Sequence, residues 1–305
     1  MKKVGLLFAA VPVLVTAAVY FLAPADSEAS SPQDRTAVDQ LARDQAKAKA
    51  ERDAAGAQRA EDDKTIAALP PGLAAPAKKE LAQQIVASSA FSSLDWRSSY
   101  AAIEDPGDGE GYTAGIVGFC TGTHDLLVLV ENYTEAHPDN GLARYLPALR
   151  KVDGTDSHEG LDPGFTAAWK AEAKVPAFRE AQEAERDEVY FDPAVRMAKL
   201  DGLGTLGQFV YYDAMILHGP DSSPNGFYGI RERALKEAGL PSEGGSERAY
   251  LKAFLDVRRE AMLAKRPGTD TSRIDTAQRR FLDSGNLALT TPLTWQVYGE
   301  TFRAP

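Results

Sequence analysis

The sequence predicts an α+β fold that is mainly helical, in one large domain or two small ones. Apolar residues recur at helical spacing in much of the chain beyond residue 76, whereas residues 112–119 form a short, β-favouring apolar run. With 305 residues, of which 44% are hydrophobic, the chain is long enough to bury a substantial core. Helices are therefore expected to build that core, with a small sheet beside them.

Residues 1–25 are predicted to be a signal peptide. Two lysines precede an apolar run from Val4 to Leu22, and an Ala-Pro-Ala sequence at residues 23–25 resembles a cleavage site. We therefore expect a secreted, extracellular protein. Because the apolar run is 19 residues long, the alternative is an uncleaved signal anchor that holds the domain at the membrane, outside the cell.

Residues 26–76 have the composition of a charged, Ala-rich linker. They contain few large apolar residues before Ile66. Alanine and opposite charges at helical spacing favour a partly helical segment, but no apolar repeat supports a coiled coil. The Pro-rich run at residues 68–76 is expected to end the linker, so the folded domain is predicted to span residues 77–305.

A second short helix is predicted after the first helix of the domain. Trp96, Tyr100 and Ile103 follow the spacing i, i+4, i+7, and Ser92 or the serine after it is expected to cap this helix. The helix is expected to end before Pro106, because proline cannot continue it.

The next stretch sets carboxylates among glycines. Glycines permit positive φ and the close approach of a ligand, so Asp108 is expected on a tight, exposed loop. Residues 112–119 are predicted to form one strand, and Thr123 is expected to cap a helix whose first turn holds Asp125. These elements predict one wall of a cleft for a ligand that is cationic or rich in hydroxyl groups.

Asp213 lies in the apolar run FVYYDAMIL at residues 209–217. An ionised carboxylate in such surroundings is strongly destabilising unless a cation pairs with it. Arg258 shares a helical face with Leu251, Leu255 and Met262, so it is a candidate partner on a buried face.

Composition excludes several classes of partner. The net charge of -10 and the pI near 5.0 argue against nucleic acid and anionic membranes as partners. They suit a cationic polymer as a partner. An acidic surface that serves only to keep the protein soluble is an equally good explanation. The four histidines lack metal-ligand spacing and Cys120 is the only cysteine, so no metal site is expected. Residues 202–207 match the GxGxxG pattern of dinucleotide-binding sites, but no predicted strand precedes them, so no cofactor is expected. We also expect the protein to be a monomer.

The chain resembles the chitosanases of glycoside hydrolase family 46 over residues 76–305. The motifs that carry the resemblance are SSLDW, IED-GDG-GYT and GFC-GT-D within residues 92–125, LARYLPAL (142–149), ERD-VYFDPAV (185–195), GQFVYYDA (207–214), HGP (218–220), YGIR (228–231), FLDVRREAML (254–263) and DTSRIDT (270–276). The resemblance implies a lysozyme-like fold of two lobes about a substrate cleft. It also implies endo-acting hydrolysis of chitosan, a β-1,4-linked glucosamine polymer, with inversion.

The resemblance assigns roles to individual residues. Inversion needs an acid and a base far enough apart to admit a water molecule. Asp108 matches the general base and Thr113 the residue that helps to hold the water, while Glu104 and Asp125 match substrate contacts. Further candidate substrate contacts are Ser92, Tyr190 and His218, the last of which has helix capping as an equal alternative. An internal ionic network that braces the cleft is matched by Asp213, Arg258 and Arg273.

The chain departs from the family at the proton donor. Family members carry a glutamate two residues before the paired serines, where this chain has Ala90, and residues 81–94 contain no acidic residue. Ala102 and Glu110 also replace a tyrosine and an arginine. Alanine cannot protonate a leaving oxygen, and general acid catalysis is worth about 10²–10⁴-fold, so a substitute donor would have to be Glu104 or Glu110.

Three functions are compatible with these residues. The first is an exported, inverting endo-chitosanase. The second is a catalytically impaired relative that keeps the cleft as a binding site for a glucosamine-containing polymer, and Ala90 favours it. The third is a hydrolase acting on another aminosugar polymer, such as peptidoglycan.

Overall fold

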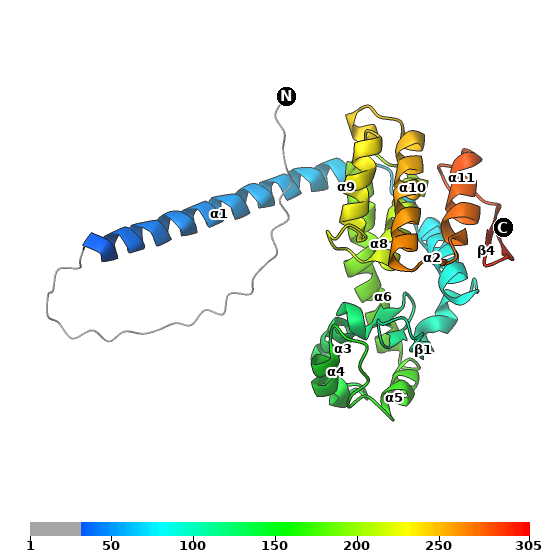
Figure 1. Cartoon of the computed structure of the whole chain (residues 1–305), viewed down its shortest axis with the longest axis horizontal. Helices are drawn as coiled ribbons and strands as arrows, with labels where there is room; N and C mark the ends of the chain where they lie inside the picture. Colours follow the sequence, from blue (N-terminus) through cyan, green and yellow to red (C-terminus); the bar gives the residue numbers. More distant parts are fainter. Residues whose placement is uncertain (1–31) are drawn as a thin grey trace. The chain divides into compact units, whose positions relative to one another are not determined.

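The computed structural model describes residues 32–305 (Figure 1). The targeting segment expected at residues 1–25 and the start of the expected linker lie outside the described residues. The chain divides into two compact units after Arg59, earlier than the boundary expected at residue 76. Within residues 32–305, no helix combines the length and the apolar character that crossing a membrane requires.

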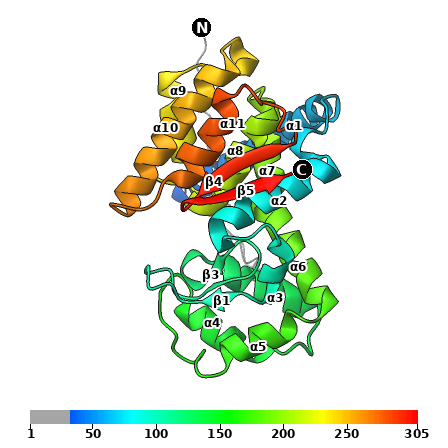
Figure 2. The same ribbon diagram turned by 90° about the vertical axis from the view of Figure 1, so that its right-hand side faces the viewer.

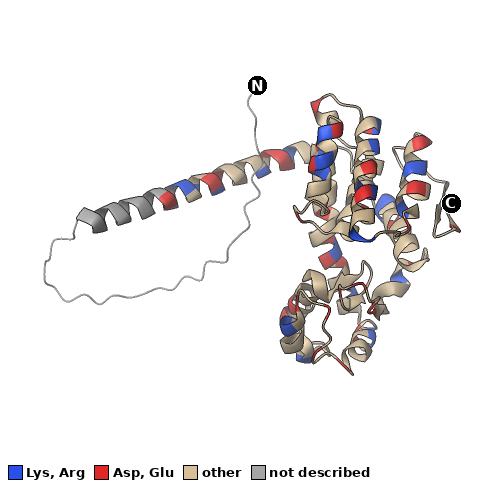
Figure 3. Cartoon of the chain, in the orientation of Figure 1, with Lys and Arg blue, Asp and Glu red and all other residues tan. Residues whose placement is uncertain are grey.

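The first described element is the long helix α1 (Pro32–Ala67), which agrees with the helical character expected of the linker. Acidic and basic residues are interspersed along its described side chains (Figure 3). Oppositely charged pairs one turn apart among the described side chains include Lys47–Glu51, Lys49–Asp53 and Lys64–Glu61. Each exposed pair of this kind contributes only about 0.3–0.5 kcal/mol, so alanine propensity and charge pairing stabilise α1 rather than apolar packing.

The end of the expected linker belongs to the second unit. Arg196 forms ion pairs with Asp63 and, at 3.3 Å, with Asp62, both in the last turns of α1. Leu73, within the short helix η1 (Gly72–Ala74), is completely buried in the core. Residues 60–76 thus carry contacts within the second unit that composition alone does not reveal.

The second unit, Ala60–Pro305, is mainly helical and has two lobes (Figure 2). One lobe contains a small antiparallel sheet, in the order β1-β2-β3, and the helices that follow it. Its elements are β1 (Ile103–Glu104), β2 (Thr113–Ala114), β3 (Phe119–Cys120), η3 (Thr121–Thr123), α3 (Asp125–Ala136), η4 (Ala143–Tyr145), α4 (Leu146–Val152) and α5 (Phe165–Glu172).

The other lobe contains longer helices and a C-terminal hairpin. Its elements are η1, α2 (Pro76–Phe91), α8 (Thr205–His218), α9 (Phe227–Glu237), η6 (Pro241–Glu243), α10 (Glu247–Lys265), η7 (Arg273–Gln278), α11 (Arg279–Asp283), β4 (Leu293–Val297) and β5 (Glu300–Ala304). Two segments connect the lobes: η2 (Trp96–Ala101), and a continuous helical run of α6 (Pro176–Arg186), η5 (Asp187–Phe191) and α7 (Asp192–Leu200).

Helix α8 forms the centre of this larger lobe. Every residue from Leu206 to Met215 is buried, because α7, α9 and α10 pack around the helix. A helix covered on all sides needs no polar face, which explains why residues 209–217 are apolar almost throughout. The one carboxylate of this run, Asp213, consequently lies in the core.

Two local predictions for the acidic stretch are wrong. The helix expected over Trp96 to Ile103 is instead the 3-10 helix η2, which ends at Ala101, while Ile103 belongs to β1. Ser92 does not cap it, because this residue ends α2 in the left-handed conformation with φ 49°. The apolar side chains Trp96 and Tyr100 are nevertheless buried, as their spacing requires.

The run at residues 112–119 forms two strands rather than one. β2 and β3 pair antiparallel, and the chain reverses between Gly115 and Gly118, which have φ of 74° and 79°. Only glycine adopts such angles without strain, so these two residues were the signal for a hairpin. α3 begins at Asp125 as expected, but Thr123 donates its hydroxyl to the Asp125 carboxylate at 2.7 Å instead of capping the helix.

Candidate active site

Asp108 lies on the exposed loop between β1 and β2, as predicted. The ends of this loop are fixed because Glu104 on β1 pairs in register with Thr113 on β2. Within it, the Asp105 carboxylate accepts the Gly107 N–H at 2.7 Å, and the Asp108 carboxylate accepts the Glu110 N–H at 3.1 Å. The loop is therefore a succession of tight turns, one of which is closed by the Asp108 side chain itself.

Two cations from the end of α10 reach this loop. Lys265 Nζ lies 2.5 Å from Glu110 Oε1, and Arg266 Nη2 lies 3.1 Å from Asp108 Oδ2. We call these two ion pairs the clasp, because they join the larger lobe to the β1–β2 loop of the smaller one. The clasp places positive charge directly on the residue matched to the general base, and it occupies Glu110, one of the two candidate substitute acids.

Thr113 faces β3, where Cys120 lies directly opposite. The Thr113 hydroxyl is 3.3 Å from Cys120 Sγ, and the thiol also donates to the Gly118 carbonyl at 3.1 Å. Burial raises the pKa of Cys120 to about 12, so the thiol stays neutral. Cys120 is thus a buried free cysteine, and its thiol contacts the hydroxyl matched to the water-holding residue.

Asp125 and Tyr190 are partners of each other. Asp125 is only 8% exposed, and its carboxylate accepts the Tyr190 hydroxyl at 2.5 Å and the Cys120 N–H at 2.8 Å. Burial raises the pKa of Asp125, while these hydrogen bonds act in the opposite direction. The structure thus brings together two predicted substrate contacts but leaves them little free surface, whereas Glu104 is exposed.

His158 forms a cluster that the sequence analysis missed. Its Nε2 lies 2.9 Å from Asp105 and its Nδ1 lies 3.4 Å from Asp162, while the Tyr112 ring stacks on the imidazole at 4.0 Å between centroids. Tyr112 donates its hydroxyl to Asp162 at 2.6 Å. Because Asp105 begins the loop that carries Asp108, His158 lies beside one end of that loop.

Ala90 is exposed in the last turn of α2, next to Ser92, which is also exposed. The carbonyl of Ser89 in the same turn accepts the Tyr298 hydroxyl at 3.1 Å. Tyr298 comes from the β4–β5 hairpin, and no sequence pattern connects it with α2. The position matched to the proton donor is therefore open to solvent but carries only a methyl group.

The predicted pairing of Asp213 with Arg258 is present in the core. Asp213 is 1% exposed, and its carboxylate lies 2.7 Å from Arg258 Nη2 and 3.1 Å from Arg273 Nε. Gln278 donates to it at 2.6 Å. Although burial by itself would raise the pKa of Asp213, Arg273 and Arg258 hold that pKa below its usual value.

His218 lies at the edge of the same network. Its Nε2 accepts the Arg258 Nε–H at 3.4 Å, and its Nδ1 faces the Asn225 carbonyl at 3.0 Å. Burial and the Arg258 charge lower the pKa of His218 to about 3, so the imidazole is neutral near neutral pH. His218 therefore binds two protein groups and terminates α8.

Both π-helices of the described chain carry site residues. η5 holds Tyr190 and η7 holds Arg273. A π-turn re-aims side chains relative to an α-helix and occurs often at functional sites. Helical periodicity cannot predict such turns, because the sequence still follows a helix-like pattern through them.

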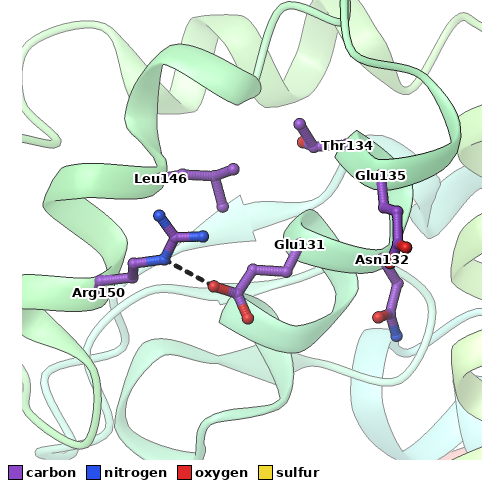
Figure 4. Close-up of a pocket in the computed structure, with 6 residues that line it drawn as sticks. All are labelled: Glu131, Asn132, Thr134, Glu135, Leu146 and Arg150. Carbon is purple, nitrogen blue, oxygen red and sulfur yellow. Dashed lines mark hydrogen bonds and ion pairs between the residues drawn. The ribbon is translucent and has the colours of Figure 1, made fainter. Parts of the chain in front are cut away.

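A surface depression between α3 and α4 is separate from these residues (Figure 4). Its lining residues are Glu131, Asn132, Thr134, Glu135, Leu146 and Arg150. The Arg150 Nε–H donates to Glu131 at 2.7 Å, so the charges there pair with each other. None of the predicted site residues lines this depression.

Comparison with known proteins agrees with the motifs. The model of glycosyl hydrolase family 46 matches residues 84–293. A chitosanase from a Streptomyces strain is 55% identical over 231 residues, which cover 76% of this chain and 83% of that protein. A chitosanase solved as a co-crystal with substrate is 51% identical with a TM-score of 0.75, over 77% of this chain and 99% of that one.

A further solved relative carries a change from glutamate to alanine. It is a mutant chitosanase from Bacillus subtilis MY002 complexed with 6 GlcN, 33% identical with a TM-score of 0.68, over 74% of this chain and 97% of that one. The matched family model and these identities extend over most of the second unit. The chain therefore belongs to glycosyl hydrolase family 46 and has the lysozyme-like, two-lobed fold of that family.

Proposed function

We propose that the protein binds chitosan between its lobes and cleaves it internally by inversion, with Asp108 as the general base. The observation that carries this proposal is the position of Asp108 on an exposed loop that leads directly into β2, the strand that begins with Thr113. The net charge of -10 supports a cationic polymer as the substrate. Relatives that are 51–55% identical bear the name chitosanase, which supports chitosan as the substrate.

In this mechanism Asp108 accepts a proton from a water molecule that the Thr113 hydroxyl helps to hold. The water attacks the anomeric carbon as the glycosidic bond breaks, and the leaving oxygen needs a proton from the other side of the sugar. Inverting enzymes supply it from a carboxylic acid about 6.5–9.5 Å from the base. Ala90 supplies none, so solvent water must provide this proton, and we expect turnover about 10²–10⁴-fold below that of the same chain with a glutamate there.

The second candidate function is binding of the polymer without turnover. Ala90 favours it, and so does the clasp, because Glu110 is engaged by Lys265 and Asp108 by Arg266. The mutant relative solved with 6 GlcN retains its ligand although a glutamate has been replaced by alanine. In this case the acidic loop would bind the ammonium groups of glucosamine units without taking part in hydrolysis.

The experiment that separates these functions measures the release of reducing ends from chitosan by the purified full-length protein, beside Asp108→Asn and Ala90→Glu variants. Hydrolysis that is lost in Asp108→Asn and rises about 10²–10⁴-fold in Ala90→Glu would support the proposed enzyme. Binding without product in the parent, followed by activity in Ala90→Glu, would support the binding protein. Hydrolysis that Asp108→Asn leaves unchanged would overturn the proposed mechanism.

A substrate with a good leaving group sharpens this test. A dinitrophenyl β-glycoside of a glucosamine oligomer needs no proton on its leaving oxygen, so the missing acid should not limit its hydrolysis. We expect the parent to cleave it at a rate close to that of Ala90→Glu. A parent that cleaves neither substrate, beside an active Ala90→Glu variant, would indicate that position 90 does more than donate a proton.

We also propose that the protein acts outside the cell as a monomer. The two lysines and the apolar run of residues 4–22 support export. N-terminal sequencing of the protein from the culture medium and from the membrane fraction tests this, because a released chain should begin near residue 26. Recovery from the cytoplasm, or a dimer by light scattering, would contradict it.

A further inference from the structure

Tyr298 occupies a position that the turn around it does not favour. It is the first of two residues, Tyr298 and Gly299, that join β4 to β5, with φ of 51° and 81°. Positive φ at both residues is the type I′ geometry, for which asparagine followed by glycine is the preferred pair. A bulky residue with positive φ is strained, and such strain concentrates at functional sites.

The side chain is held firmly yet remains open to solvent. The Tyr298 hydroxyl donates to the Ser89 carbonyl at 3.1 Å, and its backbone N–H donates to Ser272 Oγ at 2.9 Å. The neighbouring Trp295 anchors the hairpin to the same helix by donating to Ser88 Oγ at 2.9 Å. Tyr298 is nevertheless 52% exposed, more than any other large apolar side chain with described exposure.

The anchoring points connect Tyr298 with the proposed active site. Ser89 directly precedes Ala90 in the last turn of α2, and Ser272 directly precedes Arg273 of the Asp213 network. Figure 2 shows the β4–β5 hairpin running beside α2. The Tyr298 hydroxyl is therefore bound to the residue that directly precedes the position matched to the proton donor.

We propose that Tyr298 is a sugar-binding residue whose ring stacks on the glucosamine unit bound next to residue 90. A fixed phenol ring offers an apolar face to the C–H face of a pyranose at little entropic cost, and a glucosamine ammonium group adds an attraction to the π-system. This inference rests on the proposed function, because it takes chitosan as the ligand. It extends that function by adding an aromatic contact on the larger lobe to the carboxylates of the smaller one.

The alternative is that Tyr298 only caps the C-terminal end of α2, where helix carbonyls lack intrahelical partners. Two substitutions separate these roles. Tyr298→Asn removes the ring but creates the preferred Asn-Gly turn, so it should keep or raise the melting temperature. Tyr298→Phe keeps the ring but loses the hydrogen bond to Ser89, so it should lower the melting temperature slightly and preserve sugar binding.

The test is calorimetric titration of a fully deacetylated glucosamine hexamer into the full-length protein carrying Asp108→Asn to prevent turnover. Adding Tyr298→Asn should weaken binding about 3- to 10-fold, whereas Tyr298→Phe should change it less than about 2-fold. Val128→Asn, which removes an exposed apolar side chain of α3, is the matched control and should leave affinity unchanged.

Each outcome bears on a different claim. Equal affinity of Tyr298→Asn and its background, with the background binding well, would overturn the role of Tyr298 and leave the proposed function intact. Equal losses in the Asn and Phe variants would show that the hydroxyl matters and not the ring, which also overturns it. A background that does not bind the hexamer would overturn both proposals. Upfield ring-current shifts of bound sugar protons, present in the Phe variant and absent in the Asn variant, give a second readout if stability interferes.

Discussion

Replacing Asp213 by asparagine should lower the free energy of unfolding by about 3–5 kcal/mol. The carboxylate is 1% exposed and neutralises two guanidinium groups, Arg258 at 2.7 Å and Arg273 at 3.1 Å. Asparagine has nearly the same shape, so no cavity adds to the effect. The predicted cost arises from leaving Arg258, which is completely buried, with no counter-charge.

Urea denaturation and a thermal melt of the full-length protein measure this change. For a domain of this size each kcal/mol shifts the melting temperature by about 2–4 °C, so a fall of about 6–20 °C is expected. The matched control is Asp256→Asn, which removes the same charge from an ion pair with Arg279 where Asp256 is 51% exposed. That change should cost no more than about 1 kcal/mol.

The pH dependence gives an independent check on the cause. Because the pKa of Asp213 is held low in the folded state, its contribution is complete above the ordinary aspartate pKa of about 3.9 and is lost as the pH falls through the folded value. The difference between parent and Asp213→Asn should thus be constant from about pH 5 to 7 and shrink only in stronger acid. A variant as stable as the Asp256→Asn control would refute the reasoning.

Three further predictions concern the clasp, His218 and Cys120. In the double variant Lys265→Gln, Arg266→Gln, no protein cation competes with the sugar ammonium groups for the carboxylates of Asp108 and Glu110. The glucosamine hexamer should therefore bind about 2- to 10-fold more tightly at low salt. Unchanged or weaker binding would contradict this competition. His218 is protonated near pH 6.5 in the unfolded state but only near pH 3 in the folded state, so the free energy of unfolding should fall by up to about 3 kcal/mol as the pH drops from 6.5 to 4. The His218→Gln variant should lack this fall, and an unchanged pH profile of its stability would contradict the prediction. Cys120 should resist a thiol reagent at pH 8 until denaturant is added, and rapid labelling of the native protein would disprove its burial.

The sequence was most informative where one physical requirement dominated. A carboxylate inside an apolar run needs a cation, and helical periodicity placed Arg258 on a buried face, so their pairing was predictable across 45 residues. The Gly-rich segment around Asp108 likewise permits few structures other than a tight loop. The resemblance to a known family then supplied the arrangement of lobes, which local patterns do not encode.

Other features depend on packing between distant segments and left no local signal. The clasp joins Glu110 to Lys265 across 155 residues, and charged residues at the end of a helix are ordinarily solvated. The contact of Tyr298 with Ser89 spans 209 residues. In contrast, the hairpin of β2 and β3 leaves a local signal, because Gly115 and Gly118 interrupt the apolar run at residues 112–119.

A substitution at position 90 should change the catalytic activity of this protein without changing its stability. Ala90 is exposed at the end of α2, so a glutamate there would meet solvent and should change the free energy of unfolding by less than about 0.5 kcal/mol. The buried network of Asp213 and the hydrogen bonds of the Asp108 loop do not depend on which residue stands at position 90. A gain of activity in Ala90→Glu would therefore measure the supply of a proton rather than a repair of the fold, and this makes that substitution a direct test of what the site lacks.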